Sequence, residues 1–425
     1  MKMKHFLVLL AGSMLVGCGN GGTMSSGIMS SNHEAQINSI TAFYGDKLQD
    51  RVVIMDVDNM TLKTEVYTEG LDPYPVDQAG DLDKMYAITR GSNSIDIIDS
   101  NTHEKLGLIE LPHFPRSSEA YNVTLGLQLV TGADKPMASL INVHTDSVIA
   151  TVGIDETFDV EDYGGSNATG HPFWFSDSKF ALIDRPNRKI EVYNIVKNDA
   201  DDFNVTLFSS TTTPTAVHHF VKRESDDNFF YALSEGAPER GISPSILKYI
   251  LDEEELHFQS ETPLSTNAEI IPFMGSHHAD MHPDGIQMYV GSTEGNVYVL
   301  DTHTMEIKST IPVGIGAGHT TFVSERNIAV VTNHRDTFVT IVDTLTNSAI
   351  KNVTVSGDSI NGEILQSHST FVHPNMDFFY AFATDNGIFY ELDLETLEVS
   401  RSVKTGGTPL QGTFMCEGDG CVNLM

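Results

Sequence analysis

The last third of the chain alternates short hydrophobic runs with turn residues, and this pattern returns three times. In the first copy, β-forming residues fill 288–291, 296–301 and 305–314, with Gly, Asn, Asp and Thr between the runs. The second copy covers residues 318–357 and the third covers residues 367–406. Short strands that recur at a period of roughly 40–50 residues are typical of the blades of a β-propeller.

Earlier copies of the same unit open near Tyr74, Ser118, His171 and His218. Two fragments remain: residues 40–67 contain three strand-like runs without an opening strand, and residues 408–415 resemble an opening strand without successors. Joined together they complete one blade, which closes the ring and removes its free edges. We therefore predict an all-β protein with a single propeller over residues 37–425, built from eight four-stranded blades. Seven blades is the alternative, because the copies at Ser118 and His218 are irregular.

The later units resemble the YVTN repeat family of bacterial surface and periplasmic propellers. The residues that carry this resemblance are Val330-Val331-Thr332-Asn333, then 339–344 and 353–357. It is clear over residues 274–406 and weak before residue 167. The resemblance implies a propeller fold and an exported protein, and it implies no activity.

The N-terminus has the features of an export signal. A short basic start precedes an apolar run at residues 6–16, which is too short to span a bilayer. It ends in Leu15-Val16-Gly17-Cys18, which resembles the lipobox of bacterial lipoproteins and implies cleavage before Cys18 and acylation of its thiol. The alternative is an ordinary signal peptide. We expect a signal peptide at 1–17, a flexible tether at 18–36, and a lipid anchor in the outer membrane facing the periplasm or the cell surface.

The composition limits the partners. With 58 acidic and 25 basic residues the net charge is −33, so the surface repels nucleic acid and anionic lipid and attracts cations. Solubility alone also explains part of this charge. Contact with the membrane is expected through the lipid anchor only, and we expect a monomer. Cys416 and Cys421 flank a Gly-Asp-Gly turn, which in an exported protein favours a disulfide between them.

A histidine opens five of the predicted blades. His277 lies five positions before His282 and His368 five positions before His373, and the other opening histidines have the same offset from the turn that follows. This offset places five imidazoles at one position of successive innermost strands: His171, His218, His277, His319 and His368. At the same position the other blades offer Gln411, Tyr74 and Ser118, the last beside Glu119.

Innermost strands surround the central channel of a propeller, so equivalent positions form a ring around it. Imidazole is a good ligand for both Zn²⁺ and Cu²⁺. We therefore predict that the ring binds Zn²⁺, with Cu²⁺ as the alternative. In the competing structural interpretation, each histidine only forms a hydrogen bond with a neighbouring blade.

His219 and His278 directly follow two ring members, so we expect their side chains to point into a blade or to support the ligands. Each would replace its neighbour as a ligand if the strand register differed by one residue. His334 belongs to a different loop, and we expect it to face away from the ring. Further supporting or substitute positions are Gln411, Tyr74 and Glu119.

The sequence is compatible with three functions. The favoured one is a non-enzymatic metal carrier that delivers its ion to a transporter's binding protein or to an apoenzyme. In kind, though not by extended sequence, it is similar to the zinc-metallochaperone propellers of bacterial zinc uptake. The second is a periplasmic redox propeller that depends on copper or haem d1, although the chain has no Cys-x-x-Cys-His haem attachment motif. The third is a metal-free scaffold for protein interactions.

Overall fold

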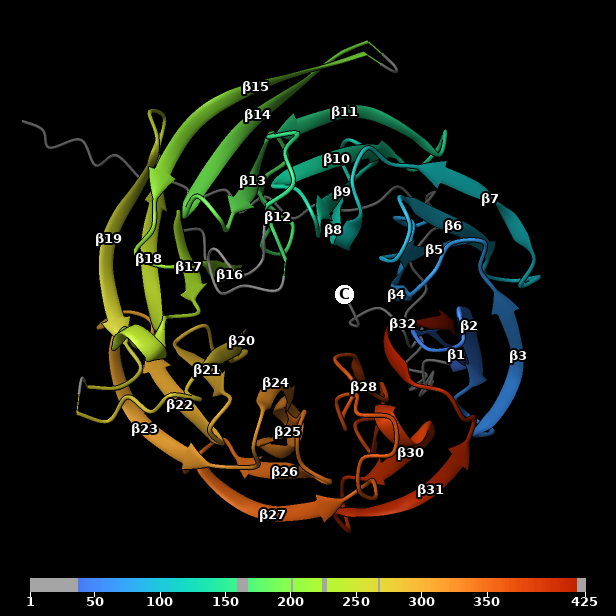
Figure 1. The fold of residues 1–425 in the computed structure, drawn as a ribbon. Coiled ribbons are helices and arrows are strands. Elements are labelled where there is room, and N and C mark those ends of the chain that lie inside the picture. Colours follow the sequence, from blue (N-terminus) through green and yellow to red (C-terminus); the bar gives the residue numbers. More distant parts are fainter. Residues whose placement is uncertain (1–36, 159–166, 200–201, 224–227, 267, 419–425) are drawn as a thin grey trace, which may run out of the picture.

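The computed structural model describes residues 37–158, 167–199, 202–223, 228–266 and 268–418. Within these residues, eight four-stranded antiparallel sheets stand side by side around a central axis (Figure 1). The predicted eight-bladed all-β propeller is confirmed, and the seven-bladed alternative is wrong. The expected signal peptide, Cys18 and the tether lie outside the described residues, whose helices are all too short to cross a bilayer.

Each blade runs from an innermost strand at the channel to an outermost strand at the rim. The innermost strands are β4 (Pro73–Gln78), β8 (Pro115–Asn122), β12 (Phe173–Ser176), β16 (Val217–Lys222), β20 (Ser276–Met281), β24 (Ala317–Val323), β28 (Thr370–Val372) and β32 (Pro409–Gly418). The second strands are β5 (Lys84–Thr89), β9 (Leu127–Gly132), β13 (Lys179–Asp184), β17 (Phe229–Ser234), β21 (Gln287–Ser292), β25 (Ile328–Asn333), β29 (Phe378–Ala383) and β1 (Ile37–Asp46).

The third and fourth strands complete the sheets. The third strands are β6 (Ser94–Asp99), β10 (Met137–Asn142), β14 (Lys189–Asp199), β18 (Ser245–Leu251), β22 (Asn296–Asp301), β26 (Phe338–Asp343), β30 (Ile388–Asp393) and β2 (Arg51–Asp56). The outermost strands are β7 (Lys105–Glu110), β11 (Ser147–Gly153), β15 (Asp202–Thr212), β19 (Leu256–Pro263), β23 (Glu306–Pro312), β27 (Ser348–Thr354), β31 (Glu398–Lys404) and β3 (Thr61–Tyr67). In the described part of the chain, three short 3-10 helices lie in loops: η2 (Pro238–Arg240), η3 (Ser324–Arg326) and η4 (Thr384–Asn386).

An aspartate at the end of the third strand sets the turn to the outermost strand. The carboxylate of Asp301 accepts the backbone N–H groups of His303 and Thr304, at 2.9 Å each. Asp343 and Asp393 form the same pair of hydrogen bonds in their own blades. A side chain that caps its own turn in this way favours the turn over continued strand, which explains why these runs stop at Asp.

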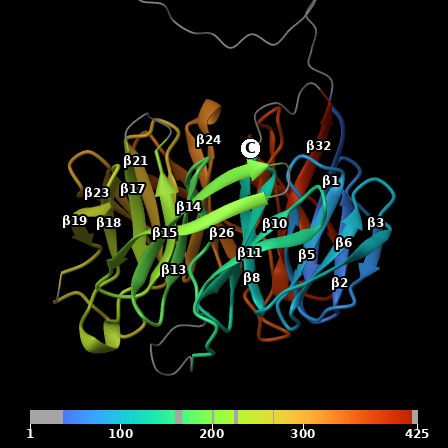
Figure 2. The ribbon, with the colours of Figure 1, turned by 90° about the horizontal axis from the view of Figure 1, so that it is seen from above.

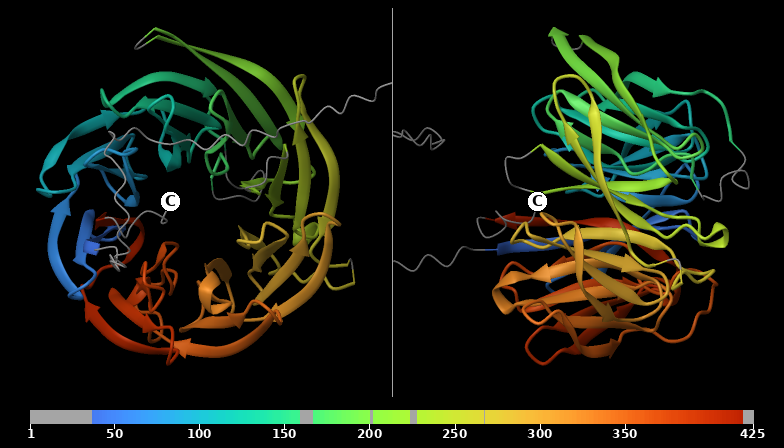
Figure 3. Two further views of the ribbon diagram at one scale, coloured as in Figure 1. Left: turned by 180° about the vertical axis from the view of Figure 1, so that it is seen from behind. Right: turned by 90° about the vertical axis from the view of Figure 1, so that its left-hand side faces the viewer.

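The hydrophobic cores lie between the faces of neighbouring blades. One core joins Phe175 and Ile183 of one blade to Phe220, Phe230 and Leu247 of the next. Second and third strands are buried on both faces, whereas outermost strands such as β23 alternate exposed and half-buried residues. Each blade is therefore stabilised mainly by its two neighbours. Figure 2 and Figure 3 show the resulting ring of tilted sheets from above, from behind and from the side.

The chain closes the ring by pairing its two ends. β1 pairs with β32 in antiparallel register, with Thr41 opposite Met415 and Tyr44 opposite Gly412, as the two sequence fragments predicted. A buried ion pair secures this joint. Asp46 is fully buried, lies 2.8 Å from Nε of Arg51, and accepts the backbone N–H of Thr408 at 2.9 Å.

Replacing Asp46 with alanine tests this closure. The variant keeps a buried arginine without its main carboxylate and loses the acceptor for Thr408, so we expect the free energy of unfolding to fall by about 3 kcal/mol. Urea unfolding followed by circular dichroism measures the loss. Asp83→Ala, which removes an exposed carboxylate between β4 and β5, is the control and is expected to unfold like the parent. An unchanged unfolding midpoint for Asp46→Ala would show that the joint does not depend on this ion pair.

Candidate metal centre at the channel

A β-bulge near the start of the innermost strands determines which residues face the channel. Ser276 of β20 pairs with Ser292, whereas Ala279 pairs with Val290, so three steps on β20 match two on β21. The extra residue changes the direction of the side chains within the bulge. Equivalent shifts in register occur in β4, β8, β16, β24 and β32.

Two neighbouring residues open each innermost strand, as His277 and His278 do in β20. The bulge turns the second of the two towards the channel. In this register His219 and His278 are equivalent to His319, and Glu119 takes the place for which the sequence suggested Ser118. A cavity of about 680 Å³ in the channel is lined by these residues, by the equivalent His171 and Gln411, and by His368 and Ser369 of β28's blade, where Ser369 holds the equivalent position and His368 the one before it. Relative to the sequence analysis, the register is shifted by one residue at His218 and at His277. The side chain of His277 lies outside the described residues.

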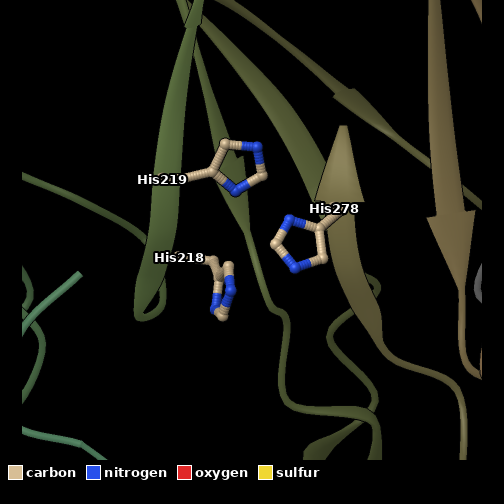
Figure 4. Close-up of side chains that lie close together, drawn as sticks. All are labelled: His218, His219 and His278. Atoms are coloured by element: carbon tan, nitrogen blue, oxygen red, sulfur yellow. The ribbon is translucent and has the colours of Figure 1, made fainter. Parts of the chain in front are cut away.

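Three imidazoles lie at the corners of a nearly equilateral triangle at one side of this channel. Their ring centroids are separated by 5.5 Å between His218 and His219, 5.3 Å between His218 and His278, and 5.3 Å between His219 and His278. One ring nitrogen from each lies within 4.8 Å of the others. Figure 4 shows the three rings gathered around a common centre. A tetrahedral ion held at about 2.0–2.1 Å by three imidazoles needs ring centroids about 5 Å apart, so this arrangement fits the donor set of zinc.

His219 presents a nitrogen that is available for such an ion. Its Nε2 lies 3.2 Å from the carbonyl oxygen of Ala279 and 3.3 Å from the backbone nitrogen of the same residue, while Nδ1 is buried and has no hydrogen-bond partner among the described residues. With the proton on Nε2, the lone pair remains on Nδ1. Burial lowers the pKa of His219 to about 4, and the nearby His171 adds to this, so the ring is neutral at pH 7. A buried nitrogen without a hydrogen bond costs free energy, and a metal ion would satisfy it.

A carboxylate hydrogen-bonds to the one ring of the three that does not line the cavity. Nδ1 of His218 lies 2.8 Å from Oε1 of Glu235, and the other oxygen of Glu235 accepts a hydrogen bond from Arg185. Carboxylates behind metal-ligating histidines fix the orientation of the ring and increase its basicity. His218 is only 6% exposed and does not line the cavity, whereas His219 and His278 do.

Acidic side chains surround the same cavity. Glu119 contacts His171, and although burial opposes ionisation, that contact lowers the pKa of Glu119 to about 2. Burial and the neighbouring Glu119 raise the pKa of Asp77, the next carboxyl along the wall, to about 7. Asp280 lies 3.7 Å from Nδ1 of His319. These groups make the cavity attractive to cations.

His334 lies close to the ring, although the sequence suggested that it faces away. Its ring stacks on that of His368 at 4.4 Å, and its Nδ1 is 2.9 Å from the carbonyl oxygen of Gln366. Gly318 makes room for it, because a Cβ at Gly318 would lie 2.1 Å from Nε2 of His334. His334 therefore occupies the space that a side chain fills at the equivalent position of other blades.

Other predicted residues lie apart from the triangle. Tyr74 stacks on Arg90, whose guanidinium carbon is 4.5 Å from the ring centroid. Ser118 donates a hydrogen bond to Asp77. Cys416 of β32 is disulfide-bonded, and Cys421, its expected partner, lies outside the described residues.

A sequence signal for the correct register exists in the opening dipeptides. In four blades they read Gly170-His171, His218-His219, His277-His278 and Gly318-His319, with histidine constant at the second position, whereas the fifth reads His368-Ser369. Aligning the second residues, rather than the first histidine of each pair, selects four of the histidines that line the cavity but does not select His368. Glu235 and His334 share another position, directly after the second strand, for which the sequence offered no comparable repeat.

Comparisons with known proteins show the fold alone. No family model matches the chain, and no curated protein matches it. The solved structures that resemble it include dihydro-haem d1 dehydrogenase NirN in complex with DHE, with a TM-score of 0.64 and 11% identity over 92% of this chain and 77% of that one. Apo AztD from Citrobacter koseri gives a TM-score of 0.58 and 11% identity, over 89% and 98% of the two chains. A putative 6-phosphogluconolactonase from Bacteroides fragilis gives 0.57 and 12%, over 77% and 98%.

The half-buried carboxyl of Asp77 leads to a prediction about pH. Because its folded-state pKa is raised from 3.8 towards 7, the folded protein binds more protons than the unfolded chain between these values, and stability falls as the pH rises through this window. Asp77→Asn removes this effect. We expect the variant to melt at a higher temperature than the parent at pH 8 and at nearly the same temperature at pH 4. Asp83→Asn, which changes an exposed carboxyl, should give no pH-dependent difference; an equal shift at both pH values for Asp77→Asn would contradict the explanation.

Proposed function

We propose that this protein binds a divalent transition-metal ion, Zn²⁺ or alternatively Cu²⁺, with His218, His219 and His278. The observation that carries the proposal is the nearly equilateral triangle of the three rings, with separations of 5.3–5.5 Å. The unpartnered Nδ1 of His219 supports it, because that atom has no other role among the described residues. Imidazole donors suit both ions, and the set of three leaves a fourth coordination position for water or another donor.

The surroundings favour a cation as the cargo. The ligands are neutral, so the charge of the ion must be balanced from further away. Asp77, Glu119 and Asp280 line the cavity, and Lys222 is the one lysine among its lining residues. Together with the overall charge of −33, these carboxylates raise the local concentration of cations at the site.

We propose a carrier rather than a resident metal centre. Two of the three ligands line an open cavity, so an ion can enter and leave without unfolding of the propeller. The receiver of the ion would be a transporter's binding protein or an apoenzyme. The lipid anchor expected at Cys18 would keep the carrier at the outer membrane.

Haem d1 is a weaker candidate for this channel. A macrocycle bound between two axial histidines needs a flat space between their rings. The rings of His278 and His319 stack with centroids 3.5 Å apart, which leaves no such space between them. The absorption spectrum of the purified protein after addition of haem distinguishes a haem-binding channel from one that binds only a metal ion.

Titration of the metal-free protein with Zn²⁺ or Cu²⁺ tests the proposal. The parent should bind the ion, and the affinity should fall as the pH is lowered because each imidazole must lose its proton before it binds. The double variant His218→Ala/His219→Ala should lose at least about 100-fold in affinity, since even residues behind metal ligands contribute about 10–100-fold.

The matched control is His257→Ala on β19. His257 lies on the surface, 2.8 Å from Asp252 and 3.2 Å from Glu255, and is the kind of place where an ion binds adventitiously. This variant should bind like the parent. If the double variant binds as tightly as the parent with an intact circular dichroism spectrum, the triangle is not the metal site.

A further inference from the structure

A second group of histidines overlaps the first. His278, His319 and His368 each have a ring nitrogen within 4.8 Å of the other two. His278 therefore belongs to both groups. We call His218, His219 and His278 the inner trio, and His278, His319 and His368 the outer trio.

The two trios differ in how well the arrangement of their rings suits coordination of an ion. The inner trio is nearly equilateral, whereas in the outer trio the rings of His278 and His319 stack at 3.5 Å and stand 5.8 and 6.0 Å from His368. Stacked rings direct their nitrogens side by side instead of towards a common centre. The outer trio therefore needs a rotation of His278 or His319 before it can surround an ion, and we expect it to bind more weakly.

The trios also differ in access. His218 and His278 are 6% and 5% exposed, while the side chain of His319 is 26% exposed. All three members of the outer trio line the cavity, and Asp280 lies beside His319. An ion that enters the cavity meets the outer trio and its carboxylate without passing His218, which lies behind the cavity wall.

The shared histidine makes the two positions mutually exclusive. A neutral imidazole has one nitrogen lone pair to give to a metal, the other nitrogen being protonated. We infer that His278 transfers a single ion between an outer, cavity-facing position and an inner, buried position, so that the chain holds one ion at a time. This inference rests on the proposed function and adds to it a route by which the ion is loaded and released.

Equilibrium titration and release kinetics of the full chain with Zn²⁺ test the inference. We expect one ion per parent chain. His218→Ala removes only the inner trio and should still bind one ion, at least about 10-fold more weakly. His368→Ala removes only the outer trio and should keep the parent's affinity within about 3-fold, but release the ion to excess EDTA at least about 10-fold more slowly. His278→Ala removes both trios and should bind no more than surface sites do.

The outcomes distinguish failure of the proposed metal binding from failure of the transfer through His278. No binding by the parent would reject the proposed function itself. Two ions per parent chain, or release from His368→Ala at the parent's rate, would overturn the transfer through His278 and leave the inner site standing. His257→Ala is the control for surface binding and should match the parent in both measurements. If an alanine variant melts well below the parent, the corresponding glutamine variant, which keeps the volume of the side chain, replaces it with the same expected result.

Discussion

Closure of the ring by the chain's own ends is the constraint on which the other features depend. A propeller blade buries its faces only against its neighbours, so loss of a strand such as β32 would leave the edge of β1 unpaired and uncover the faces packed against it. The pairing of β1 with β32 prevents this, and the buried Asp46 connects both partners of that joint through Arg51 and Thr408. Because closure fixes all eight blades around one axis, it also fixes the distances across the channel where the histidines meet.

Within that ring, the β-bulge converts a repeated sequence into a convergent site. Regular strand geometry would send neighbouring side chains to opposite faces of the sheet. The extra residue in β16 and β20 instead allows both His218 and His219 to lie near His278, from two adjacent blades. Bulges commonly redirect a side chain beside a functional site. Here the same bulge recurs in blades without histidine, so the local geometry belongs to the repeat and the chemistry belongs to particular substitutions in it.

The electrostatics of the channel follow from the choice of neutral ligands. Burial keeps imidazoles such as His219 unprotonated, which leaves them ready to bind a cation but unable to balance its charge. The carboxylates supply that balance at a distance, from Glu235 behind His218 and from Asp77, Glu119 and Asp280 around the cavity. In the proposed site this division would favour reversible binding, because no charged ligand has to be separated from the ion when it leaves.

The sequence by itself determined the propeller and the closing joint, and it favoured eight blades over seven. Hydrophobic periodicity and turn residues act locally, and their repetition along the chain reveals blades such as 318–357 before any contact is known. It also placed histidines at the start of five innermost strands, including His319 and His368. Only the tertiary structure decided which side chains converge. The bulge moves the channel position by one residue, to His219 and His278, and bulges depend on pairing with a second strand that no single segment specifies. Glu235 and His334 join the site from loops of their own blades, because packing across the ring brings them behind His218 and beside His368.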